Sequence, residues 1–265
     1  MNDIHLHTIY SVDSSARPGD LIAKSKDTGL SGICFTDHWD VGYEGFNTER
    51  IIPREYAKCE LRGLRSESGF KVFCGIEVSP MPAVLDRVRE EMADTAFDFV
   101  MLSAHFVGDV PQCRFNGFYS GRTKKEAYGR YLSTLIDLIK QYGGDFDALG
   151  HYDYISRYSP YPDQLMRYAD HEDEFDELLT LLISGNKALE VNTGKRTLRN
   201  NELPLDKKVL ARYRELGGDL ICLGSDAHRA SDAGYLFNEY AELIRGCGYK
   251  YAVYYCDRKP VYEKL

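Results

Sequence analysis

The sequence predicts an α/β fold in which parallel strands and helices alternate and the strands close, or nearly close, into a barrel. Three observations support this prediction. Short apolar runs of strand-like composition alternate with longer amphipathic stretches along the chain. The short runs are apolar throughout, as in strands that helices cover. Finally, 265 residues, 43% of them hydrophobic, suffice for one core of barrel size.

Seven apolar runs are the predicted strands. In chain order they are residues 2–6, 32–36, 71–77, 97–103, 148–150, 188–192 and 220–224. The amphipathic stretches that predict helices include residues 18–28, 124–142, 170–183 and 206–216. Pro18 favours the first turn of a helix and Gly29 its end, and paired glycines follow two of the other stretches. A last strand-like run, residues 249–256, is expected either to close or cap the barrel or to form an edge for self-association.

The composition argues against several classes of function. A formal net charge of −8 disfavours an extended nucleic-acid surface, which needs clustered basic residues. No apolar run approaches the ~20 residues that span a bilayer, and the start of the chain lacks the marks of a signal peptide, so no membrane partner is expected. The seven cysteines lack Cys-x-x-Cys spacing, which predicts reduced thiols and a cytoplasmic location. No linker or repeat interrupts the chain, so we expect a single domain over residues 1–265.

Histidines gather at the ends of the predicted strands. Six of the seven histidines stand there, in the segments His5-Leu-His7, Thr36-Asp-His38, Ser103-Ala-His105, Gly150-His151 and Asp226-Ala-His228, and Gly75-Ile-Glu77 adds a carboxylate at another strand end. One histidine at a strand end is most often a structural residue, but six along one chain are hard to attribute to chance. Active sites of such barrels lie at the C-terminal ends of the strands. These side chains are therefore expected to meet at one mouth.

This residue set predicts a metal site. His5 and His7 point to the same face of a strand because alternate residues do, while Leu6 faces the opposite layer. Mixed histidine and carboxylate ligands suit Zn, Mn or Fe, and the sequence does not choose among these metals. We expect two or three divalent ions at the mouth of the barrel. The remaining histidine, His171, lies in an acidic run that looks like the solvated start of a helix.

The motifs, taken in order, resemble those of the PHP (polymerase and histidinol phosphatase) superfamily. The resemblance runs from residue 3 to residue 228 and ends in the Gly-Ser-Asp-Ala-His segment, residues 224–228. The length and single-domain layout look most like the monofunctional histidinol-phosphate phosphatase branch. This resemblance implies a distorted TIM-like (β/α)7 barrel with a site for three ions. It also implies a phosphomonoesterase that hydrolyses L-histidinol phosphate to L-histidinol and phosphate in histidine biosynthesis.

The resemblance further implies which residues bind each ion. The first ion would be held by His5, His7, Glu77 and Asp226; the second by Glu77, His105 and His151; the third by Asp13, His38 and His228. Some relatives have a histidine at the place of Asp13, but a carboxylate is an acceptable ligand. Alternatively, Asp13 forms an Asx-turn or caps the helix that follows it.

The expected reaction is attack on phosphorus by a hydroxide that bridges two ions. Such an ion pair lowers the pKa of a shared water and neutralises phosphoryl oxygens. Glu77, as the bridging residue, would set the spacing of the ions. Asp226 or His228 would transfer the proton of the leaving group, and the sequence does not choose between them. No serine or cysteine nucleophile is required, and Ser225 is expected only to hydrogen-bond near the site.

Substrate-binding residues are predicted in two loops. Arginine matches phosphate oxygens with its planar fork, and Arg157 and Arg196 follow two of the strand-end motifs. The resemblance supports both, although Lys195 and Arg199 are rivals in the second loop. Glu190 would either contact the substrate amine or form a hydrogen bond to a ligand histidine. The predicted partner is a small-molecule phosphate ester, and the sequence leaves the oligomeric state open.

Two other functions keep the same fold. A PHP-type phosphodiesterase or exonuclease would act on nucleotides or nucleic acid ends with the same ligands, and the acidic balance of the chain disfavours it. A non-catalytic metal-binding domain would have lost some ligands, whereas nearly all are present here.

Overall fold

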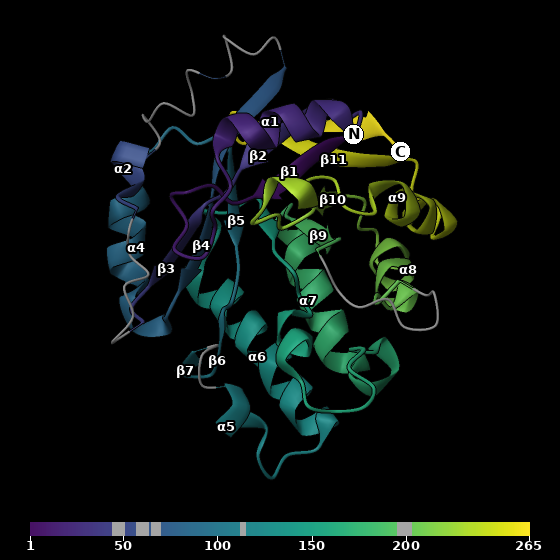
Figure 1. Cartoon of the computed structure of the whole chain (residues 1–265). Helices are drawn as coiled ribbons and strands as arrows, with labels where there is room; N and C mark the ends of the chain where they lie inside the picture. The colour runs from purple at the N-terminus through teal and green to yellow at the C-terminus, as the bar shows by residue number, and fades with distance from the viewer. Residues whose placement is uncertain (44–50, 57–63, 65–69, 112–114, 195–202) are drawn as a thin grey trace.

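A mostly parallel sheet, nearly closed into a barrel of seven strands, forms the body of the protein in the computed structural model (Figure 1). The structure describes residues 1–43, 51–56, 64, 70–111, 115–194 and 203–265. The strand order around the barrel is β1 (Asn2–Leu6), β2 (Gly32–Phe35), β4 (Lys71–Pro80), β5 (Phe99–Leu102), β8 (Ala148–Leu149), β9 (Ala188–Asn192) and β10 (Ile221–Gly224). The predicted fold class is therefore confirmed, and each predicted strand forms with its limits shifted by at most a few residues.

The barrel closes just beyond the end of β10. The Asp226 amide donates to the His5 carbonyl at 2.8 Å, and the His7 amide donates to the Ala227 carbonyl at 3.0 Å. These two bonds join the first strand to the segment that follows the last one. The register of β1 against β2 shifts between Asp3 and Leu6, so β1 is irregular beside this closure. Closure therefore brings the His-x-His motif and the Asp-Ala-His motif together through the backbone itself.

Apolar side chains fill the barrel below its mouth. All seven barrel strands contribute to one apolar cluster, as only side chains inside a barrel can. Its members are Ile4, Cys34, Phe73, Phe99, Met101, Ala148, Ala188, Leu220, Cys222, Val253, Tyr254 and Tyr255. The last three belong to β11 (Tyr251–Cys256), which pairs with β12 (Lys259–Lys264) as an antiparallel hairpin. Residues 249–256 thus cap the barrel, which is the first of the two predicted alternatives.

Helices cover the outside of the barrel (Figure 1). They are α1 (Pro18–Asp27), α2 (Pro53–Tyr56), α4 (Leu85–Met92), α5 (Phe115–Tyr119), α6 (Lys124–Tyr142), α7 (Glu172–Ser184), α8 (Lys207–Glu215) and α9 (Phe237–Gly246). All four predicted helices form. Thr123 and Glu126 make a capping box that begins α6, and Gly29, with φ of +79°, follows the end of α1 as expected for a left-handed C-terminal residue. Among the described residues, no helix is both long and apolar enough to cross a membrane.

Two features differ from the expectations. The β11–β12 hairpin turns at Asp257 and Arg258, which both have positive φ, and this pair lacks the glycine that usually marks such a turn. In addition, the prediction of a solvated His171 is wrong. Its side chain is buried at the start of α7, where it packs against Gly129 of α6 and only 3% of it is exposed. The ring turns toward the neighbouring helix while the acidic residues that follow it keep to the surface.

Shorter strands extend the mouth of the barrel. β3 (His38–Val41) pairs with the far end of β4, so that His38 lies opposite Glu77. β6 (Phe106–Val107) and β7 (Val110–Pro111) form a small hairpin immediately after His105. β3 begins at the predicted ligand His38, and β6 begins directly after the predicted ligand His105. Each strand holds the backbone beside its ligand in an extended conformation.

Candidate metal centre

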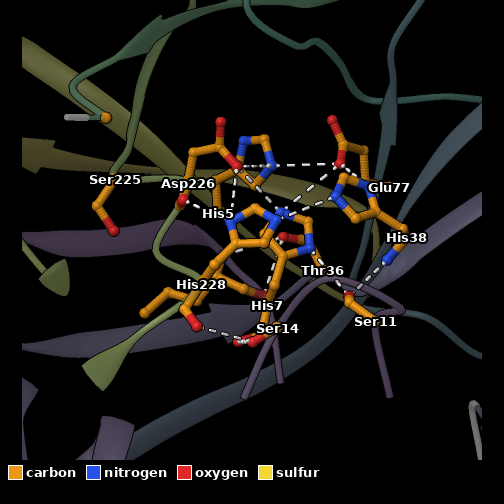
Figure 2. A network of polar contacts seen from close by, with 12 residues as sticks. His5, His7, Ser11, Ser14, Thr36, His38, Glu77, Ser225, Asp226 and His228 are labelled. Atoms are coloured by element: carbon orange, nitrogen blue, oxygen red, sulfur yellow. Dashed lines mark hydrogen bonds and ion pairs between the residues drawn. The ribbon is translucent and has the colours of Figure 1, made fainter. Parts of the chain in front are cut away.

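The histidines and carboxylates of the strand-end motifs converge at the C-terminal mouth of the barrel (Figure 2). Glu77 lies at the centre, fully buried. It shares a face of β4 with Phe73 of the barrel interior, because alternate residues point the same way. The residues that surround Glu77 are His5, His7, Asp13, His38, His105, His151, Asp226 and His228.

The first predicted group of ligands is compact. The Nε2 atom of His5 lies 3.5 Å from Glu77 Oε2 and 3.6 Å from Asp226 Oδ1. The Nε2 atom of His7 lies 3.7 Å and 3.2 Å from the same two oxygens. An ion with bonds of about 2.0–2.2 Å in tetrahedral geometry separates its ligand atoms by roughly 3.3–3.6 Å. The four side chains therefore have the spacing of a ligand set around one ion.

The second predicted group of ligands surrounds Oε1 of Glu77, whereas the first group faces Oε2. The Oε1 atom is 2.9 Å from His151 Nε2 and 3.4 Å from His105 Nε2, and these two nitrogens are 3.4 Å apart. The two oxygens of one carboxylate thus face two different sets of imidazoles. This is the arrangement that a carboxylate bridging two ions requires.

Asp13 completes a third group. The His38 and His228 Nε2 atoms are 3.2 Å apart, and the Asp13 oxygens lie 3.7 Å and 3.4 Å from them. The Asp13 side chain is 55% exposed, which makes it the most open member of the centre. The helix that follows has its N-cap at Arg17, so the structure does not place Asp13 as that cap.

Several buried polar atoms at the centre lack a hydrogen-bond partner. Among the described residues, they include Nε2 of His5, Nε2 of His7 and Oε2 of Glu77. The His38 Nδ1 atom comes within 2.7 Å of Glu77 Oε2 without hydrogen-bond geometry. Buried polar groups without partners are costly and rare in proteins. All these atoms point at a common space, so the residues present fit bound metal ions.

Carboxylates outside the centre orient two of the imidazoles. Glu190 Oε1 lies 2.6 Å from His5 Nδ1, and its Oε2 accepts the His151 amide at 2.6 Å. Asp40 Oδ1 lies 2.8 Å from His105 Nδ1. A carboxylate can only accept here, so both Nδ1 atoms carry protons, and Nε2 is the nitrogen of each ring that would bind an ion once its own proton is displaced.

The position of Glu190 bears on the two predicted roles of this residue. The side chain is buried beneath His5 and does not line the pocket described below. This position favours a hydrogen bond to His5 over contact with a substrate amine. Gly224 makes the space for it, because a Cβ atom there would come within 2.3 Å of Glu190 Oε1.

The charges at the centre shift the pKa values of its members. Burial raises the pKa of Glu77, but the positive charges of His5, His105 and His38 outweigh burial and hold that pKa well below its usual range. Burial likewise raises the pKa of Asp226, and the Arg157 guanidinium, followed by His5, holds it well below the usual range. Both carboxylates are therefore ionised at neutral pH, as metal ligands must be.

The histidines divide into two groups. Burial lowers the pKa of His7, and the neighbouring His38 and His228 lower it further, so His7 is neutral. Burial also lowers the pKa of His151. For His38 the effect of burial is outweighed by the Glu77 carboxylate, which raises the pKa to about 9. Cation binding at such positions has to displace protons.

A pocket of about 350 Å³ opens above the centre. It is lined by Asp13, His38, His105, His151, Tyr154, Arg157, Tyr158, Asp226 and His228. Arg157 donates from Nη1 to Asp226 Oδ2 at 2.7 Å and from Nη2 to Asn192 Oδ1 at 2.9 Å, and its guanidinium lies 5.3 Å from the centre of the Tyr154 ring. These contacts fix the guanidinium beside the predicted ligands.

The predicted phosphate-binding residue Arg196 and its two rivals, Lys195 and Arg199, lie outside the described residues. The Asp226 backbone has φ of +54°, a left-handed conformation that Asp tolerates better than most residues. The sequence analysis missed Tyr158 and Asn192. For Asn192 a signal was available, since it stands two residues after Glu190 on the same face of β9.

The chain matches the family model described as "PHP domain" over residues 3–194. The histidinol-phosphatase of Lactococcus lactis subsp. lactis is 28% identical over 247 residues, which cover 93% of this chain and 91% of that protein. A probable histidinol-phosphatase of Thermotoga maritima is 26% identical, with 95% of this chain and 94% of that protein covered.

Solved structures agree with these matches. The crystal structure of the Lactococcus lactis histidinol phosphate phosphatase in complex with Zn, L-histidinol and phosphate superposes with a TM-score of 0.86, at 28% identity and with 98% of both chains covered. A putative histidinol phosphatase of Listeria monocytogenes shares the fold at 17% identity, with a TM-score of 0.73, and covers 91% of this chain and 100% of that one. With the family model matching most of its length and the motif residues assembled at one mouth, this chain belongs to the PHP domain family.

Proposed function

We propose that this protein is a metal-dependent phosphomonoesterase that hydrolyses L-histidinol phosphate to L-histidinol and phosphate. The observation that carries the proposal is the placement of the predicted ligands together around Glu77, with one fixed arginine and a single small pocket beside them. The relatives named histidinol-phosphatase, and the zinc, L-histidinol and phosphate bound to one of them, support the choice of substrate. We further propose that residues 1–265 act as one domain.

The predicted ligands are proposed to hold two or three ions of Zn, Mn or Fe. When bound, such ions supply Lewis acidity toward phosphoryl oxygens and a lowered pKa for water. Glu77 serves two ligand groups with its two oxygens, so it is proposed to fix the distance between them. Asp13, His38 and His228 form the third group, at the open side of the pocket.

Arg157 is proposed to bind the phosphoryl group. Its position does not depend on substrate, because Asp226 and Asn192 already hold both of its terminal nitrogens. A guanidinium has five N–H donors, so it can donate further hydrogen bonds to phosphoryl oxygens from the free sides of its fork. Arg196, in the loop after β9, remains a second proposed phosphate-binding residue on the strength of the sequence alone.

The rest of the substrate would lie against aromatic side chains. Tyr154 and Tyr158 line the pocket, and their hydroxyls are 2.9 Å apart. Their rings offer a surface on which an imidazole or an ammonium group can pack. A pocket of about 350 Å³ matches a small phosphate ester, and the net charge of −8 disfavours nucleic acid as the partner.

Proton transfer to the leaving alkoxide is proposed for Asp226 or His228. The His228 ring is 28% exposed, whereas Asp226 is buried and held in its ionised form by Arg157. The two can be separated by the choice of leaving group. p-Nitrophenolate leaves without a proton, so loss of the proton donor should slow histidinol phosphate hydrolysis by about 10²–10⁴-fold more than p-nitrophenyl phosphate hydrolysis. Asp226→Asn and His228→Gln, each assayed on both esters, identify the donor.

The test of the function is phosphate release by the purified protein loaded with Zn or Mn. Substrates to compare are L-histidinol phosphate, p-nitrophenyl phosphate, bis-p-nitrophenyl phosphate and a short DNA strand. A strong preference for histidinol phosphate, lost on chelation and restored by metal, is expected. Preference for the diester or the DNA would refute the proposal and assign the protein to phosphodiester chemistry.

A further inference from the structure

One metal-facing histidine, His7, has no carboxylate on its outer nitrogen, unlike His5 and His105. Its Nδ1 atom lies 3.1 Å from the hydroxyl oxygen of Ser11, which lies four residues along the chain (Figure 2). The Ser11 hydroxyl in turn donates to Asp37 Oδ1 at 2.6 Å. We infer that Ser11, held by Asp37, is a positioning residue that fixes His7 in the tautomer whose Nε2 atom faces the metal centre. The inference rests on the proposed metal-binding function.

The tautomer follows from the hydrogen bonds of one hydroxyl. A serine hydroxyl has one proton to donate and two lone pairs to accept with. Its proton is given to Asp37 Oδ1, an oxygen that also accepts from the Thr8 and Ser11 amides. One lone pair accepts the His38 amide at 3.0 Å. The remaining interaction with His7 must therefore be a donation from Nδ1–H to the Ser11 oxygen, which leaves the Nε2 lone pair free.

Without Ser11, the opposite tautomer gains an advantage. His7 Nε2 lies 3.2 Å from Asp226 Oδ1 and could donate a proton to that oxygen. A ring protonated at Nε2 cannot bind an ion there. Ser11 thus determines whether His7 Nε2 donates a hydrogen bond to Asp226 or offers its lone pair to a metal ion.

Asp37 is a rigid anchor for this arrangement. The side chain is fully buried and accepts from the Thr8 amide at 2.6 Å, the Thr8 hydroxyl at 2.7 Å and the Tyr56 hydroxyl at 2.6 Å, besides the amide and hydroxyl of Ser11. These donors come from two separate segments of the chain, residues 8–11 and Tyr56. The carboxylate therefore has little freedom to turn, and it fixes the direction of the Ser11 hydroxyl.

The same hydroxyl connects two groups of predicted ligands. His7 belongs to the first group and His38 to the third, and their rings are stacked with centroids 4.0 Å apart. Ser11 contacts the ring of the one and the backbone of the other. Its loss should weaken binding of more than one ion.

A matched control lies three residues away. The Ser14 hydroxyl donates to the backbone carbonyls of His7 and His228, at 2.9 Å and 3.1 Å, and touches neither ring (Figure 2). Ser14→Ala removes a loop hydrogen bond of the same type but leaves the His7 tautomer under the control of Ser11. An effect caused only by a loosened loop would appear equally in Ser11→Ala and Ser14→Ala.

The experiment measures zinc affinity by competition with a chelator, for the full-length wild type, Ser11→Ala and Ser14→Ala. Ser11→Ala is expected to bind zinc about 10–100-fold more weakly, the usual effect of removing a hydrogen-bond partner of a ligand histidine. Ser14→Ala should stay within about threefold of wild type. In zinc-loaded protein labelled with ¹⁵N-histidine, the slowly exchanging Nδ1–H signal of His7 should persist in Ser14→Ala and disappear in Ser11→Ala.

Equal zinc affinities and an unchanged His7 signal in Ser11→Ala would overturn the inference. If Ser11→Ala does not fold by circular dichroism, Ser11→Cys replaces it, because a thiol keeps the size but hydrogen-bonds weakly; wild-type affinity in that variant would equally overturn it. Failure of the proposed function looks different, since the wild type itself would then bind no metal or leave histidinol phosphate intact.

Discussion

Replacing Glu190 by glutamine should expose how the centre depends on the buried carboxylate that contacts His5 and the His151 amide. Glu190 receives two short hydrogen bonds, from the His5 Nδ1–H and the His151 amide, each at 2.6 Å, besides longer ones of 3.4 Å from the Asn192 side chain. Glutamine has nearly the same shape but offers one acceptor and one donor. In either orientation of the glutamine side chain, its NH2 group faces another buried donor, which is the His5 Nδ1–H in one case and the His151 amide in the other.

The two orientations predict different losses. If the amide oxygen faces His5, the His151 amide is left unpaired, which costs about 1–3 kcal/mol of folding free energy and lowers Tm by about 2–12 °C. If the amide nitrogen faces His5, the ring has to move its proton to Nε2, and zinc affinity should fall by about 10–100-fold. The variant must therefore lose stability, metal affinity, or both.

The assay combines thermal unfolding of the metal-free protein with chelator competition for zinc. Glu242→Gln is the matched control, because that side chain is 77% exposed and its loss of charge should change neither quantity. A Glu190→Gln protein whose Tm lies within about 1 °C and whose zinc affinity lies within about twofold of the control would refute this account of the site.

Further predictions concern the metals and the phosphate. Glu77→Gln should abolish turnover and lower metal content, because the two ligand groups share its oxygens; elemental analysis and phosphate release check this, and full activity would exclude the bridging role. Asp13→Ala should lower zinc content by one ion while the other sites stay filled, and an anomalous-scattering map of the wild type that shows only two ions, with Asp13 turned away, would contradict the three-ion scheme. Arg196→Ala should raise KM for the phosphate ester with the metals retained, and an unchanged KM would place that residue outside the site.

The strands and their histidines could be predicted because both follow local rules. Apolar runs without alternation predict buried parallel strands, and the C-terminal ends of such strands meet by construction. The convergence of His5, His105 and Glu77 therefore needed no tertiary information beyond the fold class. Residues 249–256 were predicted as a strand, but their hairpin partner β12 was not, because the turn uses Asp257 and Arg258 in place of glycine.

The burial of individual side chains, and the hydrogen-bond partners of the predicted ligands, were harder to predict from the sequence. His171 stands in an acidic run, but the packing of α7 against α6 buries its ring. Glu190 had two possible roles in the sequence, and its position under His5 favours the hydrogen bond to a ligand histidine. Ser11 carried no signal as a single serine after the His-x-His motif, since its role depends on Asp37 and His38 from another part of the chain.

The sequence by itself determined the fold class, and it predicted the histidines and carboxylates that meet at the candidate metal centre. These properties depend on residue type and on spacing along each strand, both of which are written in the chain. Only the tertiary structure decided which nitrogen of each imidazole faces the ions, which carboxylate orients it, and that Asp226 shares its charge with Arg157. The physical reason is that tautomers and pKa values depend on atoms within a few ångströms, and closure of the barrel brings those atoms from strands far apart in the sequence.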